Sequence, residues 1–178
     1  WMSLGFRNAM LTAIGIPFSF LCTIIIMKAT GVSLNTISLF AFVLVTGIMV
    51  DDAVIIVENI YRHFQMGKSR KVAVIDGTAE VMLPVTSAAL TTMLAFLPML
   101  LMTGTTGEFF SYIPKTVTFA LIASLIEALF ILPIHFLDWG PKNPPSGKSS
   151  IAQDDPFHHV RRGPFGLFWR LYRRLLET

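Results

Sequence analysis

Four stretches of the chain are each long and apolar enough to cross a lipid bilayer as a helix. They run roughly over residues 9–27, 37–60, 81–102 and 117–137. A helix needs about 20 mostly apolar residues to cross the hydrocarbon core of a membrane. Only 14% of the residues are charged, whereas a soluble domain has about 25%. The sequence therefore predicts an all-α integral membrane protein with four transmembrane helices, and it excludes an ordinary water-soluble domain.

Several other classes of protein are excluded by the residue types that the chain contains or lacks. The high content of large apolar residues argues against disorder, and a single cysteine, Cys22, cannot support a disulfide scaffold. His158 and His159 are adjacent but have no Cys or third ligand at metal-binding spacing. There is no catalytic or nucleic-acid-binding signature, so we predict neither a metal site nor a cofactor.

Lysine and arginine are distributed unevenly between the two sides of the predicted spans. Twelve of the fourteen lie before the first span, between the second and third spans, or after the fourth span. Only Lys28 and Lys115 lie on the other side. Because loops rich in these cations remain in the cytoplasm, we expect both termini and the middle loop to be cytoplasmic. The basic residues flank apolar spans, so we expect their partner to be the lipid bilayer rather than nucleic acid.

The connections between the spans differ in length. Residues 28–36 form a short link, so the first two spans are expected to form an antiparallel hairpin, with Ser33 or Asn35 capping the second helix. The middle loop at 61–80 is long enough for a short cytoplasmic helix, which could begin after Ser69. A turn is expected on the outer side around residues 104–107.

The chain divides into three parts by composition. Residues 1–139 contain the spans, and residues 140–163 are rich in Pro, Gly, Ser and charge, which is typical of a mobile linker. Residues 164–178 place aromatic residues and leucines on one helical face and arginines on the other. We expect this C-terminal segment to be an amphipathic interfacial helix on the surface of an anionic membrane. The alternative is a helix packed on another protein segment.

Two adjacent acidic residues, Asp51 and Asp52, stand near the middle of the second span. A carboxylate at the centre of a membrane helix costs about 2.5–3.5 kcal/mol, and acids in such positions usually serve a function. Burial and a second nearby carboxylate both disfavour the ionised form of a carboxyl group. We therefore expect the pair to act as a proton relay lining one wedge of the bundle interior, with Gly47 leaving space one turn away. The alternative is a pair held permanently by hydrogen bonds.

The fourth span carries two further polar residues, Glu127 and His135. Glu127 lies near the middle of the span, where it could support the relay or could equally be a hydrogen-bonded packing residue. His135 lies near the cytoplasmic end of the span, where a solvated or interfacial histidine is expected rather than a ligand.

Residues 47–60, with the sequence GIMVDDAVIIVENI, resemble the fourth transmembrane helix of the resistance-nodulation-division (RND) efflux permeases. The resemblance covers roughly residues 1–137 in order, and the double aspartate is similar to the hydrophobe/amphiphile efflux branch. Its other motifs are Ile16-Pro17, residues 31–36, Glu80-Val81, Pro84-Val85, Gly104, Thr106-Gly107 and Leu132-Pro133.

The resemblance implies part of a proton-driven antiporter of the bacterial inner membrane, which exports drugs or amphiphiles and uses the proton gradient rather than a cofactor. In that family the paired aspartates of this helix bind and release the transported proton, a role that corresponds here to Asp51 and Asp52. The segment at 164–178 resembles the cytoplasmic surface helix that joins the two halves of such permeases.

A complete family member is several times longer, with two six-helix halves and large periplasmic domains. This chain resembles only helices three to six of the first half plus the surface helix, so it reads as a fragment that should not pump alone. The second half supplies a lysine partner for the aspartates, and complete members are expected to be homotrimers with a periplasmic adaptor and an outer-membrane channel. The alternatives are a metal-cation or protein-export branch of the same superfamily, or a stand-alone, non-transporting membrane module.

Overall fold

A computed structural model describes residues 5–140 of the chain, and within this range every regular element is helical. Four continuous rods are long and apolar enough to cross a membrane. They are α1 (Gly5–Ala29), α2 (Thr36–Gln65), α3 (Arg70–Phe96) with the 3-10 turn η1 (Leu97–Leu101), and a last rod made of α4 (Gly104–Phe110), α5 (Tyr112–Ile126), the π-helical turn η2 (Glu127–Ile131) and α6 (Leu132–Trp139). The prediction of an all-α membrane fold with four spans is confirmed for the described residues. The predicted linker beyond Gly140 and the predicted helix at 164–178 lie outside them.

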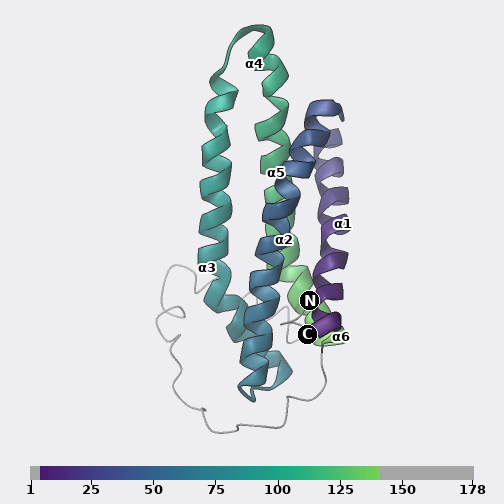
Figure 1. Cartoon of the computed structure of the whole chain (residues 1–178), viewed down its shortest axis with the longest axis vertical. Helices are drawn as coiled ribbons and strands as arrows, with labels where there is room; N and C mark the ends of the chain where they lie inside the picture. The colour runs from purple at the N-terminus through teal and green to yellow at the C-terminus, as the bar shows by residue number, and fades with distance from the viewer. Residues whose placement is uncertain (1–4, 141–178) are drawn as a thin grey trace.

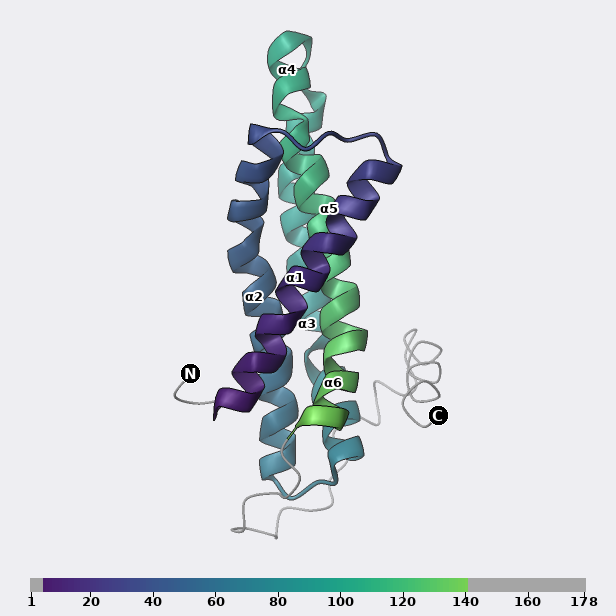
Figure 2. The same cartoon turned by 90° about the vertical axis from the view of Figure 1, so that its right-hand side faces the viewer.

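The four rods run up and down beside one another (Figure 1). The start of α1, the end of α6 and the connection between α2 and α3 lie toward one end of the bundle, and α4 lies at the other (Figure 1). α2 packs against α3 and α5, and α1 packs against α5 while inclined across it (Figure 2). In the rod that contains α5, 56% of the most apolar 18-residue stretch is buried inside the bundle, which is the largest share of the four rods. In the rod that contains α3 the share is 17%, the smallest. α5 and α2 are therefore the central helices.

Two predicted connections are shorter than the sequence suggested. α2 continues to Gln65 and α3 begins at Arg70, so the middle loop shrinks to residues 66–69. The helix expected after Ser69 does begin there, but it is continuous with the third span rather than separate. The expected turn at 104–107 is also wrong, because Gly104 begins α4. Gly104 adopts a φ of 77°, a conformation that glycine reaches without strain, and the chain reverses just before it.

The second helix starts where its capping residue predicts. The Asn35 side chain accepts hydrogen bonds from the backbone N–H groups of Ile37 and Ser38, at 3.0 and 2.8 Å. The Ser38 hydroxyl in turn accepts from the Asn35 backbone N–H at 2.8 Å. This reciprocal pair satisfies amide donors that the first turn of a helix otherwise leaves unbonded. Asn35 rather than Ser33 is therefore the cap.

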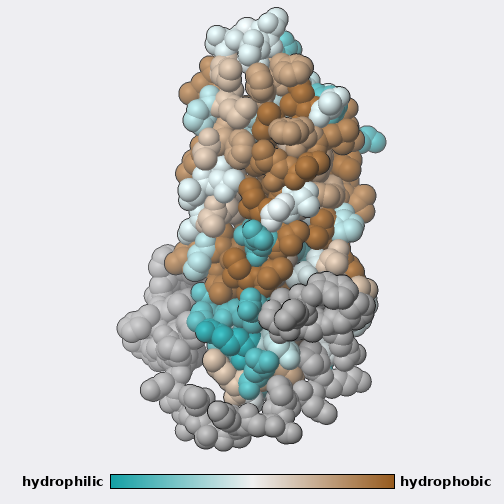
Figure 3. Space-filling view, in the orientation of Figure 1, coloured by the Kyte–Doolittle hydropathy of each residue, from teal (hydrophilic) through white to brown (hydrophobic). Residues whose placement is uncertain are grey.

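The interior of the bundle consists of two apolar clusters stacked along the helix axes. One cluster joins α2 to α5 and contains Ala41, Val45, Met49, Ile113, Val117, Ala120 and Leu121. The other joins α2 to α3, η2 and α6, and contains Ala53, Ile56, Val57, Ile60, Val74, Met82, Val85, Ala128, Leu129, Leu132 and Phe136. Outward-facing apolar side chains form a broad band over the same length, and polar residues gather below it (Figure 3). This surface is suited to contact with lipid.

Candidate proton site and the family of the chain

The two aspartates of α2 point in different directions. Asp51 is exposed on the surface of the four-helix bundle, whereas Asp52 is buried, with 5% of its surface accessible. Successive residues of an α-helix are separated by about 100°, and at this level the buried face of α2 takes Asp52 and Ala53, which leaves Asp51 outside it. The expectation that both line the bundle interior is therefore wrong for these four helices: Asp52 faces inward and Asp51 faces outward.

Asp51 belongs to an exposed stripe of α2 that also contains Gly47 one turn before it and Glu58 two turns after it. A Cβ atom built on Gly47 would meet no heavy atom within 4 Å, so the space beside Asp51 is open. The predicted space next to the aspartate pair is present, and it adjoins the outward-facing member.

Asp52 lies at the boundary between the two apolar clusters. Met49 belongs to one cluster and Ala53 to the other. The Asp52 Oδ2 atom is buried and has no hydrogen-bond partner among the described residues. An unpaired ionised carboxylate is costly to bury, whereas the neutral acid costs less. Asp52 is thus placed where a proton, or a cation supplied from outside these helices, would satisfy it.

Glu127 occupies the corresponding boundary on the other central rod. Leu121 precedes it in one cluster, and Ala128 follows it in the other. Glu127 is buried, with 2% of its surface accessible, and its Oε1 atom has no hydrogen-bond partner within residues 5–140. The carboxyl group lies against α1, since a Cβ built on Gly15 would overlap Glu127 Oε1. The role of Glu127, as support for the relay or as a packing residue, stays a prediction.

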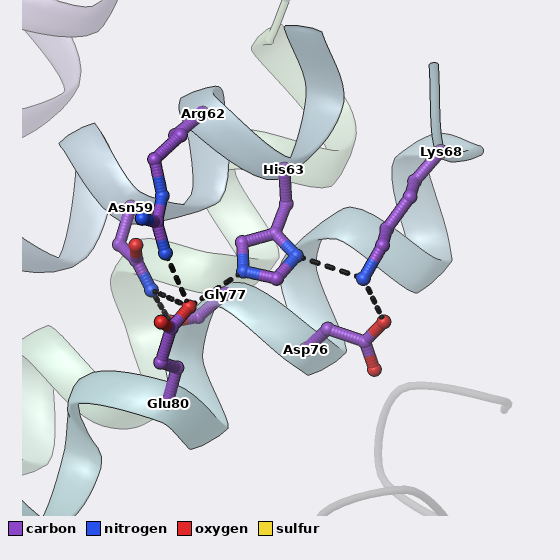
Figure 4. A network of polar contacts seen from close by, with 7 residues as sticks. All are labelled: Asn59, Arg62, His63, Lys68, Asp76, Gly77 and Glu80. Atoms are coloured by element: carbon purple, nitrogen blue, oxygen red, sulfur yellow. Dashed lines mark hydrogen bonds and ion pairs between the residues drawn. The ribbon is translucent and has the colours of Figure 1, made fainter. Parts of the chain in front are cut away.

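A polar network that the sequence did not predict joins the ends of α2 and α3 (Figure 4). One carboxylate oxygen, Glu80 Oε2, accepts from Asn59 Nδ2 at 3.0 Å, from Arg62 Nη2 at 2.6 Å and from His63 Nε2 at 2.7 Å. Asn59 and His63 are both buried. Glu80 therefore gathers three donors from one face of α2 and ties the two helices together.

The network extends through the histidine ring to the loop (Figure 4). Lys68 Nζ lies 2.9 Å from His63 Nδ1 and donates to Asp76 Oδ2 at 2.7 Å. Because a lysine ammonium can only donate, His63 Nδ1 is the acceptor and the ring hydrogen is on Nε2, directed at Glu80. The Asn59 amide also donates to the Gly77 carbonyl at 2.7 Å. A signal existed in the sequence, since Asn59 and Glu80 both lie within the family-like motifs, but their partners depend on how α2 packs on α3.

His135 lies in α6 with its ring stacked on Trp139 at a centroid distance of 5.8 Å. It is half-buried, and its Nδ1 atom has no partner among residues 5–140. The structure does not bring His135 into contact with the aspartates through any described hydrogen bond.

Comparison with known proteins gives a consistent match over the helical part of the chain. Residues 4–136 match the model of the AcrB/AcrD/AcrF family. Multidrug resistance protein MdtC of Yersinia pestis is 35% identical over 142 residues, which is 80% of this chain and 14% of the relative. The Escherichia coli protein of the same name is 37% identical over 128 residues, which is 72% of this chain and 12% of the relative. The matched part of the chain thus spans about one seventh of these relatives. The chain belongs to the AcrB/AcrD/AcrF family of RND efflux permeases, and its kinship is with transporters rather than enzymes.

Proposed function

We propose that this chain is the proton-translocating segment of a drug or amphiphile:proton antiporter, with Asp51 and Asp52 as the residues that bind and release the proton. The observation that carries the proposal is a buried carboxyl, Asp52, whose Oδ2 has no partner among the described residues, adjacent to an exposed carboxyl in a membrane helix of an efflux family. Membrane-embedded acids of this kind are typical of proton pathways in transporters.

The opposite orientations of the two aspartates suggest how the pair works. Asp52 can remain buried as a neutral acid, and loss of its proton would require a new partner or a change in helix packing. Asp51 faces outward beside the open space at Gly47, where a cation from the rest of the transporter could approach. The family resemblance assigns that part to a lysine of the second helical half.

The remaining parts of the proposal follow from the family and from the distribution of charge. The segment resides in the bacterial inner membrane with both ends and the loop at 66–69 in the cytoplasm, and the proton gradient supplies the energy. The complete transporter is a homotrimer that acts with a periplasmic adaptor and an outer-membrane channel.

The relatives favour the drug branch over the alternatives. Both are named multidrug resistance proteins, which supports drug export over transport of metal cations or export of proteins. A stand-alone, non-transporting module is disfavoured because the relatives contain this segment within a much longer chain. Gly47 and Glu127 are proposed as residues that support the proton relay.

The test is to place Asp51→Asn and Asp52→Asn separately in the complete transporter that contains this segment. Each variant is expected to lower proton-coupled dye export to the level of vesicles without transporter, while the amount inserted in the membrane is unchanged. Glu58→Gln is a matched control, because Glu58 is an exposed acid of the same helix. It should leave export within about twofold of the wild type. Export retained by both aspartate variants would refute the proposal.

A further inference from the structure

The contact between α1 and the π turn η2 is built around Glu127. α1 packs against η2 and α6, and the carboxyl of Glu127 fills the space above Gly15. A Cβ atom at position 15 would overlap Oε1 and Cδ of Glu127, so a larger residue there would require the carboxyl to move. Because Gly15 has no side chain, the carboxyl of Glu127 fits between α1 and η2 at this point.

The π turn gives this acid its position. The backbone N–H of Leu132 donates to the carbonyl of Glu127, five residues earlier. Pro133 follows directly and has no backbone N–H to donate. This missing donor explains why the helix departs from the regular α-helical hydrogen-bond pattern and forms a π turn here. π turns are rare and are frequently found at functional sites. The wider turn places Glu127 at the junction of the two apolar clusters, directly beside the apolar residues Ile126 and Ala128.

The charged side chains that the structure describes on the surrounding helices do not bond to Glu127; that of Arg7, at the start of α1, is not among them. Lys28 lies in the last turn of α1, and Lys115 lies in the first turn of α5, where it donates to the Ser111 hydroxyl. Both are far along their helices from Glu127. On α2, Asp52 is itself acidic, and His63 is bonded to Glu80 and Lys68. On α6, Asp138 is exposed, and the His135 ring stacks on Trp139. No hydrogen bond or ion pair joins any of these groups to Glu127 within residues 5–140.

We propose that Glu127 is a second proton-binding site of the bundle, separate from the aspartate pair, and that its neutral acid form keeps α1 seated on η2. A neutral carboxyl can be enclosed against Gly15 at moderate cost, whereas a carboxylate there would have no bonded cation among the described side chains. Loss of the proton would therefore favour states in which α1 separates from η2 and water reaches Glu127. This inference stands apart from the proposed role of Asp51 and Asp52.

The experiment uses infrared spectroscopy on the full chain reconstituted in phosphatidylcholine vesicles at neutral pH. Protonated carboxyl groups give a C=O stretching band that carboxylates do not. We expect such a band in the wild type, with contributions from Asp52 and Glu127, and we expect Glu127→Gln to remove the Glu127 contribution. The double variant Asp51→Asn/Asp52→Asn should retain it, which separates this site from the aspartates. Glu108→Gln, which alters an exposed acid of α4, should also leave the band unchanged.

A measurement on the unmutated chain guards against variants that fold poorly. Labelling with ¹³C-glutamate should shift the protonated carboxyl band, because the carrier is a glutamate and not an aspartate. The second half of the proposal is read from a spin label on Cys22, the single cysteine of the chain, which lies on α1 two turns after Gly15. The label should gain mobility as pH is raised in the wild type, but not in Glu127→Gln. A neutral-pH spectrum without a glutamate-derived protonated band would overturn the proposal, as would a label whose mobility does not depend on Glu127.

Discussion

Two buried carboxyl groups stand between the apolar clusters of the bundle, and each one contains an oxygen without a partner among the described residues. Asp52 and Glu127 are 5% and 2% exposed, and both stand between the two apolar clusters on the central rods. Two such acids reduce the packing free energy that apolar residues would contribute at the same positions. Their presence is understandable if a change of protonation, rather than stability, is what these positions provide. This is the physical basis of both proposals.

Two glycines of the described bundle have opposite surroundings, and this difference predicts opposite effects of adding one methyl group. A Cβ on Gly77 would lie 2.7 Å from the Ile60 Cα atom, whereas a Cβ on Gly47 would meet nothing within 4 Å. Gly77→Ala should therefore force α3 away from α2 and destabilise the bundle by about 1–3 kcal/mol. Gly47→Ala should leave stability unchanged or slightly higher, because alanine favours the helix.

The measurement for this pair is thermal unfolding of the purified chain in detergent, followed by circular dichroism. The unfolding midpoint of Gly77→Ala should fall clearly below that of the wild type, and the midpoint of Gly47→Ala should not. Equal midpoints for the two variants would contradict the close approach of α2 and α3 at Gly77.

At the scale of elements, α2 and α3 form a hairpin whose closed end is held by polar contacts. Glu80 joins α3 to Asn59, Arg62 and His63 of α2, and the Arg70 guanidinium donates to the Leu137 carbonyl of α6 at 2.6 Å. Arg62 and Glu80 are partly accessible to solvent, at 50% and 31%, so their ion pair by itself contributes little. The buried histidine and asparagine give the network its directional hydrogen bonds. The network therefore fixes how α2 is aligned along α3 more than it adds to the stability of the bundle.

Replacing the acceptor of this network should loosen the hairpin end without unfolding the spans. Glu80→Gln keeps the shape of the side chain but removes the charge that attracts Arg62 and His63. We expect faster trypsin cleavage at Lys68, Arg70 and Lys71, by a factor of about 3–10, which corresponds to the net contribution of about one ordinary hydrogen bond. Glu108→Gln, an exposed acid outside the network, is the control. Cleavage rates that are the same in both variants would show that Glu80 does not hold this end closed.

At the scale of the whole molecule, the bundle has large apolar surfaces that four helices alone leave uncovered. α3 is the most exposed rod, with large side chains such as Leu83, Leu90 and Leu94 more than half accessible. Lipid can cover such a surface, but the outward-facing Asp51 needs a polar partner. Since the matched segment spans about 14% of the Yersinia relative, further helices of a complete transporter are the proposed source of that partner.

The orientation of the bundle can be tested with two engineered cysteines in a background in which Cys22 is replaced by serine. Met66→Cys lies in the α2–α3 connection, and Thr105→Cys lies in α4 at the opposite end, and both positions are exposed. The charge distribution predicts that a membrane-impermeant maleimide added to intact spheroplasts labels position 105 and not position 66. Labelling should reach position 66 only after the membrane is opened. The reverse pattern would invert the proposed topology.

The sequence by itself determined the number and approximate position of the spans in the described chain, because hydrocarbon of fixed thickness requires apolar runs of a minimum length. It also limited the cap of α2 to Ser33 or Asn35, since capping is a local interaction, and the structure selects Asn35. The tertiary structure decided the features that depend on contacts between helices, which a local sequence pattern cannot encode. Helical period separates the directions of Asp51 and Asp52, but only the packing of α3 and α5 on α2 selects which one is buried. The space for Glu127 against Gly15, and the meeting of Asn59 and His63 with Glu80, likewise depend on how separate helices approach one another.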